Sequence, residues 1–337
     1  MDKKGGITGS IARLCHLRLS LSGFAEETTL PSETATIVDS RGQSVDISCP
    51  GERIVSITSA ASEVICALDA GHRIVGRDSY SLVAPHLGDV PVVAGSSASP
   101  NVELIPEIDP DVMIADTMLP DDHCERIEEA DIPVIVESAW DVTTAIKIVR
   151  NFGMMLDKYE RADEIMGLIE QYQCIVEERI ALLEEEVDKP AVYRPYFTSS
   201  SKTPLDNLVT VAGGINIAHE ESARYPTVSP EWLVERDPEM IISIISAAED
   251  ITEEMLEEAR NEMLSRQGLS SVKAVEDDRV YVLSSPIRSG VPSIVGELYL
   301  AKWFHPELFQ DINLEKVHEE LVREFFGQEL EGVYVYP

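Results

Sequence analysis

The chain has 337 residues, 44% of them hydrophobic, which is enough for one large domain or two of ordinary size. Lysine and arginine total 27 against 61 aspartates and glutamates, and the net charge of -34 argues against nucleic acid or anionic lipid as a partner. The five cysteines and seven histidines lack zinc-site or disulfide-framework spacing, and no phosphate loop or nucleophile motif follows an apolar run. We therefore predict no enzymatic activity, no cofactor and no metal ligands of the protein's own.

The first 35 residues are expected to form a leader and a linker. Two lysines precede a largely apolar run over 7–25, which is the order of a secretory leader, although Arg13 and Arg18 interrupt the run. A working leader and a degraded or misassigned start both remain open. No later stretch has the roughly 18 consecutive apolar residues that a membrane span needs.

From Arg53 the chain alternates between short apolar runs, typical of buried strands, and amphipathic stretches, typical of helices. In the first half we expect strands at 54–57, 74–76, 90–93, 112–115 and 134–136, and helices ending at Gly71 and spanning 102–108, 122–130 and 142–156. In the second half we expect strands at 191–197, 241–245 and 280–283, and helices from Pro204 and over 253–265, 292–303 and 314–326. This pattern predicts an α/β fold with lobes over 36–140 and 190–304, followed by a helical extension over 305–337.

A long amphipathic helix is expected over 160–187, between the two lobes. Its apolar residues recur every three or four positions, Asp157 is placed to cap its start, and Pro190 prevents its continuation. Twenty-eight residues at helical rise reach roughly 42 Å, more than one small lobe needs. A coiled coil is the weaker alternative, because the run lacks sustained heptads on either side. We therefore assign 141–189 to a helical segment that joins the lobes.

An internal repeat supports two related lobes. Residues 101–111 and 229–239 match without a gap. In each copy a capping residue precedes a glutamate, Glu103 or Glu231, in the first turn of a short helix, and an Asp-Pro pair ends the helix before a strand. Glutamate near a helix start and Asp-Pro at its end are common separately, but their paired spacing is not.

The loops after the predicted strands should face a cleft between the lobes, where open α/β sheets bind ligands. The candidate ligand-binding residues on these loops are Ser59, Tyr80, Ser97, Met118, Tyr196, Tyr225 and Arg288. Aromatic rings with polar tips and a single arginine suit a bulky, partly apolar ligand that carries negative groups. For each tyrosine, packing at a strand end is the alternative, and for Arg288 it is a surface ion pair.

Six stretches, in order, resemble the substrate-binding proteins of ABC importers for iron(III)-siderophores and cobalamin. They are 53–71, 78–80, 101–103, 109–115, 212–218 and 228–231, and the likeness extends from about Thr36 to Phe309. The resemblance implies the class III periplasmic-binding-protein fold, in which two Rossmann-like lobes are joined by a single long backbone helix with little hinge motion. It also implies an extracytoplasmic location, periplasmic or at the cell surface.

By position, the resemblance assigns Tyr80, Tyr225 and Arg288 to ligand contacts, and Glu103 and Glu231 to docking on the permease. The implied partners are the ABC permease and ATPase subunits, with the membrane reached only through the permease.

The ligand class follows from a departure within the resemblance. Ser97 and Met118 stand roughly where cobalamin-binding members have cleft tryptophans. An iron(III) chelate such as a ferric siderophore is therefore favoured over cobalamin, another corrinoid or haem. A ligand sensor of the same fold without a transport role is a further alternative.

Overall fold

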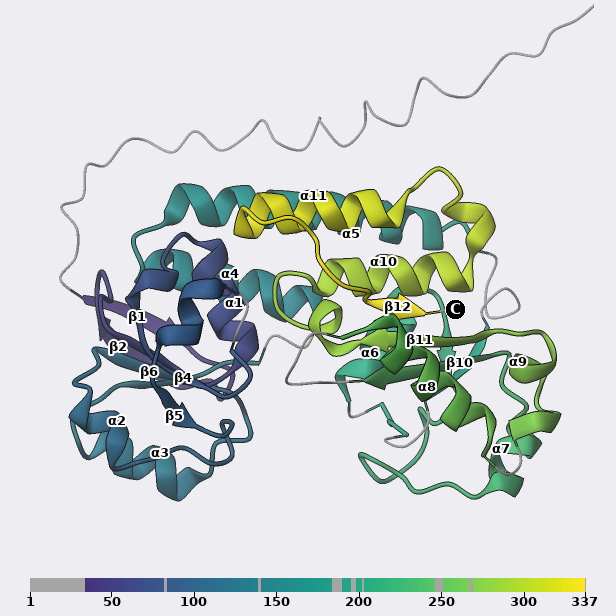
Figure 1. The fold of residues 1–337 in the computed structure, drawn as a ribbon, viewed down its shortest axis with the longest axis horizontal. Helices are drawn as coiled ribbons and strands as arrows, with labels where there is room; N and C mark the ends of the chain where they lie inside the picture. The colour runs from purple at the N-terminus through teal and green to yellow at the C-terminus, as the bar shows by residue number, and fades with distance from the viewer. Residues whose placement is uncertain are drawn as a thin grey trace, which may run out of the picture. The chain divides into compact units, whose positions relative to one another are not determined.

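The computed structural model describes residues 34–81, 84–138, 141–183, 190–194, 198–201, 203–245, 251–266 and 269–336. One five-stranded sheet precedes the long helix α5 (Tyr159–Ile180) in the chain and a second follows it (Figure 1). The predicted α/β fold, with two Rossmann-like lobes and a backbone helix between them, is confirmed. Within the described ranges, no helix is both long and apolar enough to cross a membrane.

The first sheet is entirely parallel. Its strands are β3 (Ile54–Ser56), β4 (Ile74–Asp78), β5 (Val92–Ala94), β6 (Val112–Ala115) and β7 (Val134–Val136), in the order β5-β4-β3-β6-β7. Its helices are α1 (Ser59–Ala67), α2 (Leu104–Glu107), α3 (Asp121–Glu128) and α4 (Val142–Met155). The central strands are buried throughout, as expected for a parallel sheet covered on both faces. The strand order reverses between β3 and β6, so their carboxyl ends form a topological switch point.

The second sheet has the order β12-β11-β10-β8-β9, and only β12 runs antiparallel to its neighbour. Its strands are β8 (Ala191–Tyr193), β9 (Ile215–Asn216), β10 (Met240–Ile245), β11 (Val280–Ser284) and β12 (Val335–Tyr336). Its helices are α6 (Pro204–Val211), α7 (Pro230–Arg236), α8 (Glu253–Leu264), α9 (Lys273–Glu276) and α10 (Ser293–Phe304), and α11 (Leu314–Phe326) follows. Strands β9 and β12 were not predicted, because two residues are too few to show a period.

Helix α5 is shorter than predicted. Its 22 residues reach about 33 Å, and the helix begins after Lys158 rather than with a cap at Asp157. Asp157 has φ of 54°, a left-handed conformation, whereas an N-cap needs extended backbone. The helix ends at Ile180, and turn hydrogen bonds follow at Leu182 and Leu183. Three glutamates come next in the sequence, and negative charge is unfavourable at the carboxyl end of a helix. Positions 184–187 of the predicted helix lie outside the described residues.

Two arginines of α5 contact different parts of the chain. Arg161 donates through Nε to the carbonyl of Ala67 in α1 at 2.9 Å and pairs with Glu324 of α11 at 3.3 Å. Arg179 forms a bidentate pair with Asp311, at 2.6 and 2.9 Å, and lies over the Phe309 ring. The first contact secures the amino-terminal part of α5 and the second its carboxyl-terminal part.

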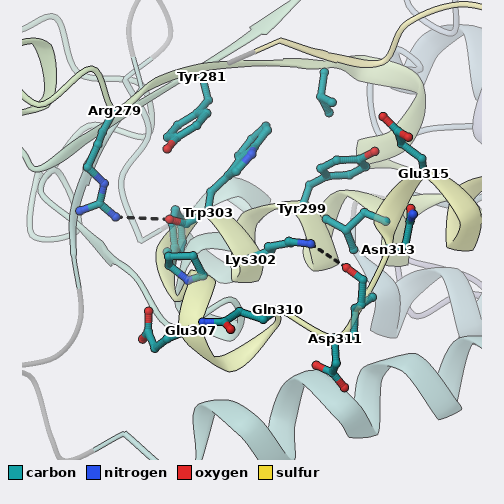
Figure 2. A pocket seen from close by; sticks show the side chains of 15 residues that line it. Arg279, Tyr281, Tyr299, Lys302, Trp303, Glu307, Gln310, Asp311, Asn313 and Glu315 are labelled. Atoms are coloured by element: carbon teal, nitrogen blue, oxygen red, sulfur yellow. Dashed lines mark hydrogen bonds between the residues drawn. The ribbon is translucent and has the colours of Figure 1, made fainter.

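A row of aromatic side chains lines an open cavity of about 930 Å³ beside α10 (Figure 2). Tyr281 and Trp303 stack with ring centroids 4.5 Å apart, and Tyr299 lies on the other side of Trp303 at 5.8 Å. Arg279 donates to the Trp303 carbonyl and Lys302 to the Ile312 carbonyl, so both cations are held by backbone oxygens.

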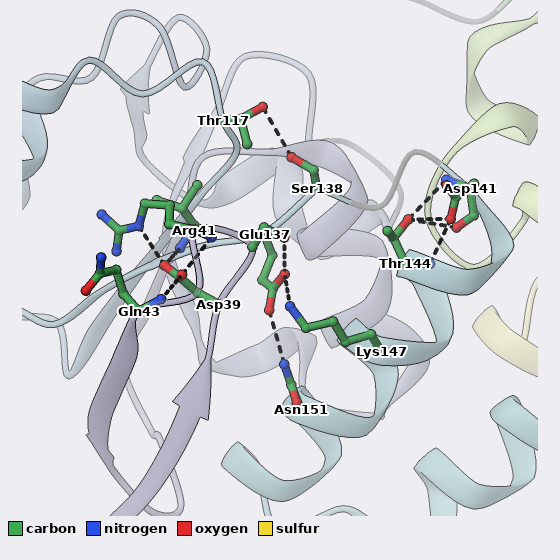
Figure 3. A network of polar contacts seen from close by, with 12 residues as sticks. Asp39, Arg41, Gln43, Thr117, Glu137, Ser138, Asp141, Thr144, Lys147 and Asn151 are labelled. Carbon is green, nitrogen blue, oxygen red and sulfur yellow. Dashed lines mark hydrogen bonds and ion pairs between the residues drawn. The ribbon is translucent and has the colours of Figure 1, made fainter. Parts of the chain in front are cut away.

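An antiparallel hairpin, β1 (Thr34–Val38) and β2 (Ser44–Ser48), was not predicted from the sequence, where a linker was expected up to residue 35. It is attached to the first sheet by Glu137, which follows β7 and is buried (Figure 3). The Glu137 carboxylate accepts hydrogen bonds from Ser40 at 2.6 Å and Asn151 at 3.1 Å, and pairs with Lys147 at 3.3 Å. One carboxylate therefore connects the hairpin, β7 and α4.

Replacing Glu137 with alanine should lower the free energy of unfolding by about 1–3 kcal/mol, because Ser40, Asn151 and Lys147 would lose their common acceptor. Chemical denaturation of both proteins measures this difference. Glu125→Ala, on the exposed side of α3, is the control and should change stability by less than about 0.5 kcal/mol. Equal effects of the two substitutions would contradict a structural role for Glu137.

A second buried carboxylate, Glu297, lies on α10 where this helix contacts α4 and α5. Burial, together with the charges of Glu177 and Asp141, raises the pKa of Glu297 to about 8. The side chain is therefore protonated in the folded protein at neutral pH.

Glu297→Gln should remove part of the pH dependence of stability. The folded pKa lies above the unfolded one, so the contribution of Glu297 is complete below about pH 4.5 and is lost as pH rises through about 8. The variant should gain a few kcal/mol over the parent at about pH 9 and almost nothing at about pH 4. Thermal denaturation across this range measures the difference, and parallel curves would show that Glu297 ionises normally.

The sequence repeat has a structural counterpart. Asp111 forms two hydrogen bonds with Arg53, the residue before β3. The Asp111 amide donates to the Arg53 carbonyl and the Asp111 carboxylate accepts from the Arg53 amide, both at 2.8 Å. Glu239 does the same with Ala191 of β8, at 2.9 and 3.3 Å. The positions before them, Asp109 and Asp237, both have left-handed backbone. Both copies therefore connect their short helix to a strand in the same way.

Candidate functional site

Ser97 connects the carboxyl ends of β3 and β6, the two neighbouring strands at the switch point of the first sheet. Its hydroxyl donates to the Ile57 carbonyl after β3, at 2.8 Å, and accepts from the Asp116 amide after β6, at 3.0 Å. With 1% of its surface exposed, it lies beneath the loops and not on their surface. The expectation that Ser97 reaches a ligand does not fit this burial, and Ser97 is a structural support of the switch point.

The loops above Ser97 present two large exposed side chains. Tyr80, after β4, is 54% exposed, and Met118, after β6, is 50% exposed. Ser59 is half-buried as the first residue of α1. Their exposure leaves Tyr80 and Met118 available for contact with an apolar ligand surface.

Two buried aspartates hold these loops and were missed by the sequence analysis. Asp78 accepts from the Ser81 amide and Asp116 from the Met118 amide, each at 2.8 Å. Burial raises the pKa of both carboxyls, and the charge of Asp78 further raises that of Asp116. For Asp116 the available signal was an aspartate directly after the apolar run over 112–115, whereas Asp78 follows Arg77 and shows no such signal.

The loops of the second sheet bring together two arginines and a tyrosine. Arg288 lies in the short turn over Ser285–Arg288 after β11, and Arg194 directly follows β8. Burial, and next the charge of Arg194, lower the pKa of Arg288 to about 10, against an opposing effect of Tyr225. Burial also lowers the pKa of Arg194, and the charge of Tyr225 acts in the opposite direction. The three side chains are thus within electrostatic reach of one another.

Tyr225 is 51% exposed, and its loop is hydrogen-bonded to the segment that contains Ser200. The Arg224 guanidinium lies 5.6 Å from the centre of its ring, and the Arg224 carbonyl accepts from the Ser200 amide at 3.2 Å. Tyr196, the remaining predicted ligand contact, lies outside the described residues. The structure therefore brings Tyr225 and Arg288 together and adds Arg194 to them.

Two glycines allow the Arg288 turn to pack closely against helices on both sides. Gly290 has φ of +68°, and a Cβ there would overlap Oε2 of Glu63 in α1. A Cβ on Gly296 in α10 would overlap the Ile287 carbonyl oxygen and lie 3.6 Å from Cα of Arg288. The position of Arg288 therefore depends on contacts with α1 and α10.

The aromatic cavity of Figure 2 contains none of the predicted site residues. Arg279 and Tyr281 in its wall lie at the amino end of β11, whereas Arg288 follows the carboxyl end. Ligands of open α/β sheets bind at the carboxyl ends. We therefore place the candidate site at the loops with Arg194, Tyr225 and Arg288. Among the residues with described positions, no group of three or more His, Cys, Asp or Glu side chains could hold a metal ion.

Glu103 and Glu231 are both exposed, as expected. Glu103 lies at an open groove of about 480 Å³ that includes the exposed side chain of Val92. The pKa of Glu231 is lowered, mainly by its own backbone amide and then by Ser229. Val234, one turn after Glu231, is also exposed. Each lobe thus combines an exposed carboxylate with an exposed valine.

Comparisons with known proteins agree with this architecture. A family model described as Periplasmic binding protein matches residues 54–287. The molybdate-binding protein MolA of Haemophilus influenzae is 22% identical over 330 residues, covering 86% of this chain and 90% of that protein. A cobalamin-binding protein of Halobacterium salinarum is 22% identical over 216 residues, covering 62% of this chain and 58% of that protein.

Solved structures show the same fold. MolA bound to molybdate superposes with a TM-score of 0.75 over 88% of this chain and 99% of the other, at 19% identity. The TroA-like periplasmic binding protein FepB from Veillonella parvula superposes with a TM-score of 0.74, over 89% of this chain and 99% of the other, at 26% identity.

Because the family match spans more than half of the chain, the protein belongs to the periplasmic binding protein family. Its predicted place among the substrate-binding proteins of ABC importers, with the class III fold, is confirmed.

Proposed function

We propose that this protein is the extracytoplasmic substrate-binding component of an ABC importer, and that it captures an anionic iron(III) chelate of the siderophore class and delivers it to a permease. The observation that carries the proposal is the Arg194–Arg288 pair beside Tyr225 at the carboxyl ends of the second sheet. The pair brings two positive charges together in a chain with a net charge of -34.

The electrostatics of the pair favour an anionic ligand. Two half-buried guanidinium groups repel each other and lose hydration, and both effects lower the pKa of Arg288. An anion bound between them would offset the repulsion and accept charge-assisted hydrogen bonds from both planar groups. This geometry suits a carboxylate, a catecholate or an oxyanion better than a neutral group.

Exposed apolar side chains favour a ligand larger than a simple ion. Tyr80, Met118 and Tyr225 are among the large hydrophobic side chains that the described part of the chain leaves exposed. They belong to loops after strands of both sheets. A chelate with an organic shell would cover such side chains, whereas a small oxyanion would not.

A small oxyanion such as molybdate is the second candidate. It is supported by the arginine pair and by the similarity to MolA, whose name and structure refer to molybdate. Cobalamin and haem are further alternatives within the same family, as is a ligand sensor without a transport role.

A titration series would separate these candidates. Calorimetry with ferric tris-catecholate and tris-hydroxamate chelates, molybdate, haem and cyanocobalamin should give binding to a ferric chelate. Arg194→Ala and Arg288→Ala should each weaken that binding by about 1.5–3 kcal/mol, because a charge-assisted hydrogen bond is lost. Tyr80→Ala should weaken binding of a chelate but not of molybdate.

The control is Arg279→Ala, at the opposite end of β11, which should leave the affinity unchanged. If no ferric chelate binds at micromolar concentration, the chelate proposal is wrong. If an anion binds but both arginine variants keep the parent affinity, the site lies elsewhere.

We also propose that Glu103 and Glu231 are the contact points for the permease. The support is their exposure and their equivalent places in the two copies of the repeat. Charges at the rim of an interface steer association and fix orientation more than they add affinity. Two such carboxylates on different lobes would define how the protein sits on its partner.

Reversing both charges, with Glu103→Lys and Glu231→Lys, should abolish ligand-dependent stimulation of ATPase activity in a reconstituted importer while ligand affinity stays unchanged. A matched double reversal, Glu125→Lys and Glu257→Lys, changes the net charge equally at exposed positions of α3 and α8 and should retain stimulation. Full activity of the first variant would contradict the docking assignment.

A further inference from the structure

A buried carboxyl group lies directly behind the Arg288 turn. Glu63 is on α1, one helical turn after Ser59. Its Oε2 atom is buried without a hydrogen-bond partner among the described residues and lies against Gly290, where a Cβ would overlap it. Cα of Ala60 is 3.7 Å from the same Cβ position. The first two turns of α1 therefore form the surface on which the segment after Arg288 rests.

An unpartnered buried carboxyl is tolerated when it is neutral and is costly when it is ionised. Burial raises the pKa of Glu63 to about 8. At neutral pH the group is therefore the uncharged acid, which can pack against the Gly290 backbone. Above that pKa the same contact would place an unscreened charge against the segment.

We propose that Glu63 is a positioning residue for Arg288: its protonated form holds the segment over residues 288–290 against α1, and its ionisation releases that segment. Anion capture is then linked to the presence of one proton on Glu63. The link to capture rests on the proposed function of Arg288, whereas the effect on the segment does not.

Cys66 and Arg288, which lie near Glu63, keep their charge state near pH 8, whereas Glu297 on α10, next to Gly296, also has a pKa of about 8. On α1, burial and then the charge of Glu63 raise the pKa of the Cys66 thiol to about 12, so it stays neutral. In the turn, Arg288 has a pKa of about 10 and faces Arg194 and Tyr225. At the far end of α1, Arg161 of α5 pairs with Asp69 and with Glu324 of α11. The contact is complete below about pH 4.5 and is lost as pH rises through about 8.

Hydrogen exchange of the ligand-free protein tests the positioning role. After correction for intrinsic rates, the segment over 285–291 should lose protection between about pH 6.5 and about pH 9 in the parent. Glu63→Gln, which mimics the neutral acid, should keep its protection. Glu297→Gln, at a second buried carboxyl with a pKa of about 8, is the control and should lose protection as the parent does. Equal loss in the parent and Glu63→Gln, or no loss in either, would overturn the proposal.

A direct titration covers the case in which Glu63→Gln does not fold. The ¹³C carboxyl shift of Glu63 in the parent should change with the same midpoint as the exchange of the segment. Different midpoints would show that another group releases it.

Binding measured with molybdate and with a ferric tris-catecholate tests the linkage to capture. Above about pH 8 the affinity of the parent should fall by up to about tenfold per pH unit, as expected for one linked proton, and that of Glu63→Gln should not. The same pH dependence in both proteins would overturn the linkage. If neither probe binds, the proposed function fails, and the exchange result still decides the positioning role.

Discussion

The two arginines of α5 provide the constraint on which the arrangement of the chain depends. Arg161 and Arg179 are 18 residues apart, which is five helical turns, so they point to the same side of the helix about 27 Å from each other. The first pairs with α11 and bonds to α1, and the second pairs with the segment between α10 and α11. Because a continuous helix resists bending, two such attachments fix the separation of the parts they join.

The parts of the fold that could be predicted are those in which a pattern and a cap coincide. Helix α11 was predicted with its observed bounds, since an amphipathic run begins after Asn313, whose side chain caps it, and ends at Gly327 with left-handed backbone. The buried strands β6 and β7 were predicted in full because each is a continuous apolar run. The hairpin of β1 and β2 was missed although β1 alternates between buried and exposed residues. It is held by Glu137 and by β7, which lie about a hundred residues later, and no local pattern shows such contacts.

The candidate site was only partly predictable, and the reason is again distance along the chain. Arg288 could be identified because it is flanked by proline, serine and glycine in a turn. Arg194 follows an ordinary apolar strand, and its proposed role depends on β8 and β11 being separated in one sheet by β10 alone. Ser97 was expected to face the cleft because it lies on a loop after a predicted strand. Its burial results from pairing with the ends of β3 and β6, which the sequence does not reveal.

The short strand β12 also protects an edge of the second sheet. Val335 and Tyr336 pair with Leu283 and Val282 of β11, and the Tyr334 carbonyl accepts from the Ser284 amide at 2.8 Å. Without this pairing, β11 would offer unpaired backbone groups to a strand from another molecule, which is a common start of aggregation. Removal of these few residues by a protease would leave the helices intact and expose β11 as an unpaired edge strand. The pairing of residues 335–336 therefore bears on whether β11 can join a strand of another molecule.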